Sequence, residues 1–125
     1  MKTFTPLKVK INTKTDTVTL EVKVSSVVPA TTIAKLPNGK LILDKAHGHI
    51  EKEEVGDRSE LTGKKLVFYH TFDLRGLDKD NWLPALKKII INYLINDKEY
   101  RIQPYKTLTE VSDKKIGLIY EIDVQ

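Results

Sequence analysis

The stretch "TVTLEVKV", residues 17–24, alternates polar and apolar side chains along its whole length. Successive side chains of a β-strand point to opposite faces, so an extended chain collects the apolar members of this stretch on one face. The pattern therefore predicts a strand with one buried and one exposed face. The residues expected in the core are Val18, Leu20, Val22 and Val24.

Four further strands are predicted around this stretch. Residues 7–11, "LKVKI", also alternate, and a short polar linker joins them to residues 17–24, which predicts an antiparallel hairpin. Residues 32–44 are interrupted by Pro-Asn-Gly at positions 37–39, which supplies the fixed φ and the positive φ of a tight turn, so a second hairpin is expected there. Residues 47–52 predict a short strand before an irregular acidic stretch.

The second half of the chain contains the predicted helix. Residues 65–74, "KLVFYHTFDL", are rich in aromatic and β-branched side chains and predict a strand. Residues 81–95, "NWLPALKKIIINYLI", predict a helix, because Asn81 can cap its N-terminus and Pro84 falls in the first turn. After "KEYRI", the stretches "YKTLTEV" and "KIGLIYEIDV" predict a closing hairpin.

This order of elements predicts a β-rich α+β fold. The expected architecture is an antiparallel β-sandwich or a partly open β-barrel with one amphipathic helix over residues 81–95 and a C-terminal β-hairpin. A chain of 125 residues without repeats or linkers is expected to form one domain, residues 1–125.

Composition excludes several kinds of chemistry. The chain has no cysteine, so it forms neither disulfides nor thiolate metal sites. The net charge of +4 divides into +2 for residues 1–63 and +2 for residues 64–125, so neither half concentrates the excess. No signal peptide and no run of ~18 apolar residues is found, so we expect a cytoplasmic location, or a particle made in the cytoplasm, and no membrane partner.

No catalytic residues are predicted. The serines lie outside any G-x-S-x-G sequence, so we expect them in turns and strands. Residues 56–65 are similar to a phosphate-binding loop, but their glycines are too far apart and Lys65 occupies the position of the magnesium-binding Ser or Thr. We therefore expect neither an enzyme nor a cofactor.

The stretch "DKAHGHIEKEEVG", residues 44–56, is the candidate metal site. In an extended chain His47, His49 and Glu51 share a face and could ligate one divalent ion. The spacing of His47, His49 and Glu53 also resembles the first metal motif of the cupin family, with His70 in the place of the later histidine. The alternative, which we favour, is a solvated charged edge, because no second shell of supporting groups is visible.

Nucleic-acid binding is a second alternative. The order of strands and helix is similar to that of an OB-fold, in which sheet aromatics stack on bases. The residues that would contact single-stranded nucleic acid are Lys64, Lys65, Arg101, Tyr105 and Lys106.

The leading hypothesis is a non-catalytic assembly or protein-binding module. On a helix over residues 81–95, Ile91 and Ile95 lie opposite the core-facing stripe, next to Lys87 and Lys88. Apolar side chains on a second helix face favour contact with a loop of the same chain or with another subunit. The alternative is that the helix ends near Tyr93 and that Ile95 turns inward with the following strand. In architecture, a small cysteine-free β-sandwich with one helix is similar to the tube and neck components of phage tails and related injection machines.

Overall fold

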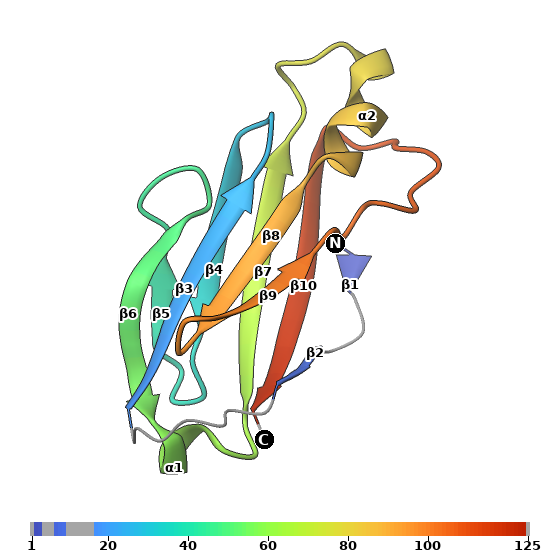
Figure 1. The fold of residues 1–125 in the computed structure, drawn as a ribbon. Helices are drawn as coiled ribbons and strands as arrows, with labels where there is room; N and C mark the ends of the chain where they lie inside the picture. Colours follow the sequence, from blue (N-terminus) through green and yellow to red (C-terminus); the bar gives the residue numbers. More distant parts are fainter. Residues whose placement is uncertain (1, 4–6, 10–16, 125) are drawn as a thin grey trace.

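The strands form two stacked sheets (Figure 1). The computed structural model describes residues 2–3, 7–9 and 17–124. Sheet A has the order β1 (Lys2–Thr3), β10 (Lys115–Val124), β7 (Lys65–Asp73), β4 (Ala30–Lys35) and β5 (Leu41–Leu43), and β2 (Leu7–Val9) also pairs with β10. Sheet B has the order β6 (Ile50–Asp57), β3 (Thr17–Ser25), β8 (Ile90–Ile95) and β9 (Lys98–Ile102).

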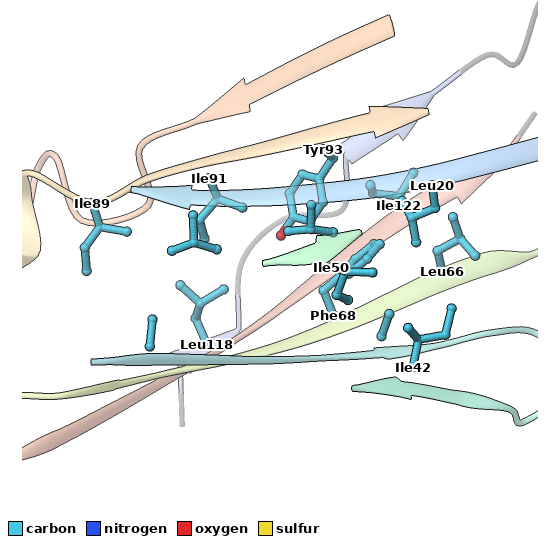
Figure 2. Close-up of a cluster of buried hydrophobic side chains, with 14 of the residues drawn as sticks. Leu20, Ile42, Ile50, Leu66, Phe68, Ile89, Ile91, Tyr93, Leu118 and Ile122 are labelled. Carbon is cyan, nitrogen blue, oxygen red and sulfur yellow. The ribbon is translucent and has the colours of Figure 1, made fainter. Parts of the chain in front are cut away.

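The core lies between the two sheets. Alternate side chains of β3, β4, β7 and β8 point inward, and the predicted inward residues of β3 are 0 to 5% exposed. Figure 2 shows Leu20, Ile91 and Tyr93 of sheet B pointing toward Phe68 and Leu118 of sheet A. The Phe68 and Tyr93 ring centroids are 4.6 Å apart, so aromatic side chains of both sheets are in contact. The predicted strand-rich α+β sandwich is therefore confirmed.

The predicted helix over residues 81–95 is wrong beyond its first turns. The helix α2 spans only Trp82–Lys87, after a 3₁₀ turn over Lys79–Asn81, and Ile90–Ile95 form the strand β8 between β3 and β9. Ile91 and Ile95 are inward-facing core residues, 0% and 3% exposed. The stretch is rich in β-branched side chains, and its apolar residues fit both the helical and the strand period. Pairing with neighbouring strands on both sides stabilises the strand.

Only one of the three predicted hairpins forms as expected. Strands β4 and β5 pair antiparallel, and the turn between them has Gly39 at φ +88°, a conformation that glycine adopts without strain. The predicted N-terminal hairpin is wrong, because β2 pairs in parallel with β10 in sheet A whereas β3 belongs to sheet B. Residues 10 and 11 of the predicted strand lie outside the described residues.

The predicted C-terminal hairpin is also wrong. Residues 105–111 form turns and irregular structure, and β10 pairs with β7 of sheet A. The hairpin in this region is β8 with β9, joined by Asn96 and Asp97 at φ +50° and +65°. Two successive positive φ values match the twist of the flanking strands, as in a type I′ turn. The chain then crosses from sheet B to sheet A through residues 103–114.

The acidic stretch after His49 is more regular than predicted. Ile50–Asp57 form the strand β6 at the edge of sheet B, and the helix α1 (Arg58–Leu61) follows directly. The predicted strand over residues 47–52 therefore starts three residues later, because His47 and Gly48 lie in a turn with φ +53° and +80°. Most side chains of β6 are exposed, which is typical of a charged edge strand.

Candidate functional site: the outer face of sheet A

The outer face of sheet A carries apolar side chains on four adjacent strands. Between inward-facing core residues, β4 turns Ile33 outward, β7 turns Val67 and Tyr69 outward, and β10 turns Ile119 outward. All four are partly exposed. At the edge, β5 adds Leu41 and Leu43, which are 55% and 65% exposed. We call this surface the sheet A apolar face; it consists of Ile33, Leu41, Leu43, Val67, Tyr69 and Ile119.

The strand register arranges these side chains in two rows. Directly paired residues place Leu43, Ile33, Tyr69 and Ile119 in one row across the sheet. The next row contains Leu41, Lys35, Val67 and Glu121. Directly opposed side chains on neighbouring strands lie about 5 Å apart, so each row forms a continuous strip of contacts.

Polar groups border the face at both ends of β7. At one end the ammonium of Lys65 lies 3.1 Å from the Glu121 carboxylate, and this hydrogen bond raises the pKa of Lys65. At the other end the Arg75 guanidinium binds the Asp73 carboxylate at 2.7 Å and lowers the pKa of Asp73 to about 2. Thr31 and Thr71 hydrogen-bond to each other between that end and the apolar rows. Charged and hydroxyl groups therefore frame an apolar centre.

The outer face of sheet B has a different chemistry. Its strand register places Lys23, Asn92 and Arg101 in one row. The neighbouring row contains Glu21, Leu94 and Glu99, so its one apolar side chain lies between two carboxylates. This is the alternation of apolar inside and polar outside that is usual for a sheet with one solvated face.

A buried polar network joins the two sheets. His70 of β7 is 1% exposed; its Nδ1 atom lies 2.9 Å from Thr32 Oγ1, and its Nε2 atom lies 2.6 Å from the Tyr93 hydroxyl of β8. Burial lowers the pKa of His70 to about 3 and raises that of Tyr93, so both side chains are neutral at pH 7. Thr32 and Tyr93 are fully buried as well, so the network links the sheets and does not meet solvent or substrate.

The structure does not assemble the candidate metal site. His47 lies in an exposed turn, while His49 Nδ1 accepts a hydrogen bond from the Val24 backbone N–H at 3.2 Å. Glu51 and Glu53 pair instead with lysines, at 2.9 Å and 3.8 Å. Within residues 17–124, no group of three or more His, Asp or Glu side chains is placed to hold a metal ion. The cupin-like assignment of His70 is wrong, because that side chain lies in the buried network.

The candidate nucleic-acid residues are also separated. Tyr105 is 1% exposed and packs edge-on against Phe72, with ring centroids 6.0 Å apart, so it offers no surface for a base. Lys64 and Lys65 lie at the start of β7, whereas Tyr105 and the exposed Lys106 lie near its end. Arg101 lies on the outer face of sheet B. The predicted role of Tyr105 is therefore wrong, and the basic residues do not form one strip.

The predicted interaction patch does not form either. Lys87 and Lys88 are exposed at the end of α2, but Ile91 and Ile95 are in the core, so the four residues share no surface. Sequence reasoning missed the sheet A apolar face, although a signal was present. The apolar residues of β7 and β10 include adjacent pairs such as Leu118 and Ile119, and near-continuous apolar runs are typical of strands covered on both faces.

Comparison with family models, curated proteins and solved structures found no match to this chain. In the described ranges, no helix has the length and apolar character needed to cross a membrane.

Proposed function

We propose that this protein is a non-catalytic assembly or protein-binding module whose protein partner covers the sheet A apolar face. The observation that supports this proposal is the pattern of β7 and β10, which present apolar side chains on both faces although only one face contacts the core. Leaving such side chains in water costs roughly 25 cal/mol for each Å² that a partner would bury. Contiguous apolar patches rimmed by polar groups commonly mark protein interaction sites.

The edge strand β5 supports the same proposal. Its Leu41 and Leu43 are among the most exposed large apolar side chains of the described chain. Edge strands of free proteins are usually protected by charged side chains. The exposed leucines of β5 therefore favour a partner that covers this edge. The proposal retains the cytoplasmic location expected from the sequence. In its narrower form, the proposal is that this chain is a subunit of a larger particle, such as one with phage-tail architecture.

Lysine substitution at the edge tests the proposal. We expect the protein in a cell extract to elute in gel filtration above the mass of the 14.3 kDa chain. Leu41→Lys combined with Leu43→Lys should shift it to the monomer position, because two ammonium groups would have to be desolvated in the interface. Val27→Lys is the matched control, since Val27 is also 65% exposed but lies in the loop between β3 and β4.

The control variant should keep the elution position of the unmodified protein, and circular dichroism should show that both variants remain folded. Elution of the unmodified protein as a monomer, in extract and when concentrated, would contradict the proposal. So would an assembly that the two edge lysines leave intact.

A further inference from the structure

We infer that the partner on the sheet A apolar face is a second copy of this chain, packed face to face about a two-fold axis that runs along β7. This inference rests on the proposed function and adds the identity of the partner. Three properties of the face support it: the symmetry of its apolar row, the placement of its charges and the area it offers.

The apolar row is symmetric about β7. In sheet A, β4 and β10 flank β7 on opposite sides, and the register places Ile33 and Ile119 on either side of Tyr69. A two-fold rotation about β7 lays β4 of one copy over β10 of the other at the same height. Ile33 then faces Ile119 of the partner subunit, and the two Tyr69 rings meet at the centre. Self-complementarity of this kind is what a two-fold interface requires.

The charges of the next row are complementary under the same rotation. Lys35 and Glu121 lie on either side of Val67, again one on β4 and one on β10. The rotation places each Lys35 opposite Glu121 of the partner subunit, which gives two symmetric ion pairs. Glu121 already binds Lys65, and a carboxylate can accept both lysines. In the described part of the chain Lys35 has no ion-pair partner, so the dimer would supply one.

The outer face of sheet B is not complementary to itself under the corresponding two-fold rotation. There β8 is flanked by β3 and β9, and rotation about β8 would place Lys23 opposite Arg101 of the partner subunit. It would also place Glu21 opposite Glu99 of the partner subunit. Like charges face each other in both rows, and such pairs disfavour association. The charge pattern therefore selects sheet A as the self-association face.

The available area fits a weak, reversible dimer. Strands about 4.8 Å apart that rise about 3.3 Å per residue give the residues of β5, β4, β7 and β10 a flat area of roughly 440 Å². Two copies would thus bury roughly 900 Å² in total, in the range of weak and transient interfaces. We therefore expect an equilibrium between monomer and dimer that depends on protein concentration.

Charge reversal tests the inference by sedimentation velocity on the purified full chain over a concentration series. Lys35→Glu and Glu121→Lys should each weaken the dimer by roughly tenfold or more, because each replaces two attractive pairs with two repulsive ones. An equimolar mixture of the two variants should form a heterodimer with both attractions restored, and the double variant should dimerise alone. Within one chain the two positions are two strands apart, so intramolecular pairing does not explain such a rescue.

A dimer that neither reversal weakens, or a mixture that stays monomeric while the unmodified protein dimerises, would overturn the inference. The remaining outcomes separate it from the proposed function. The purified protein could be monomeric at all concentrations and still elute from extract in a larger complex that Leu41→Lys with Leu43→Lys disrupts. That result would show that the partner is not a second copy, and it would retain the proposed function. A monomer in both settings overturns both.

Discussion

The outer faces of the two sheets carry side chains of opposite chemistry. Both sheets bury one side against a shared core, yet sheet B turns charged and amide side chains to solvent, whereas sheet A turns Ile33, Val67, Tyr69 and Ile119 outward. The central strands β8 and β7 contribute similarly to the core, with three and four buried side chains. Stability of the sandwich therefore does not require an apolar outer face, and the proposed association would account for the difference.

The two outer faces exist only while the protein is folded, and burial of His70 makes the free energy of unfolding depend on pH. Its folded-state pKa of about 3 lies below the ordinary value of 6.5. The unfolded chain therefore binds a proton between these pH values that the folded chain does not, and stability falls as pH falls through this window. The limiting slope is about 1.4 kcal/mol per pH unit, and the expected loss between pH 6.5 and pH 5 is about 1.6 kcal/mol.

Urea unfolding at these two pH values measures the effect. His70→Gln is the control, because the amide can still hydrogen-bond but does not titrate, so its stability should change much less over the same range. Asp73, whose pKa is lowered to about 2, contributes stability that is lost only as pH falls below about 4, outside this range. Equal pH dependence in the unmodified protein and in His70→Gln would show that His70 is not the cause.

An effect on association, and not on folding, is expected when one lysine is placed at the centre of each outer face. Tyr69→Lys should weaken self-association by roughly a hundredfold, because it removes the central ring and buries two ammonium groups at the two-fold axis. Leu94→Lys should leave association unchanged, since Leu94 is the corresponding partly exposed residue of sheet B. Light scattering after gel filtration measures both. Equal weakening by the two substitutions would remove the distinction between the faces.

Local patterns predicted the parts of the fold that depend on neighbours in sequence. The alternation of residues 17–24 identified the core side of β3, and Pro-Asn-Gly at 37–39 identified the β4–β5 turn. Alternation also marked residues 7–9 as a strand, but it does not specify a partner. Sheet membership depends on pairing between distant segments, such as β2 with β10, and no local signal encodes that choice.

The candidate site was harder to predict, for two physical reasons. Residues 89–95 satisfy both the helical and the strand period, and the helical interpretation moved Ile91 and Ile95 from the core to a surface. The apolar row on the outer face of sheet A depends on the register of strand pairing. Ile33, Tyr69 and Ile119 become neighbours only when three strands that are distant in sequence pair. His70 carried a weak signal, since it shares the inward side of β7 with Phe68 and Phe72, but its partners Thr32 and Tyr93 are distant in sequence.

The most direct test of the self-association face is an isotope-filtered NOE experiment on a mixture of labelled and unlabelled chains. The filter reports only contacts between different molecules, and within one chain Ile33 and Ile119 are separated by two strand spacings, about 10 Å. We predict intermolecular NOEs between the Ile33 and Ile119 methyl groups at concentrations where the dimer is populated. Intermolecular NOEs that instead involve Leu94 and its neighbours on sheet B, or none from sheet A in a populated dimer, would contradict the account.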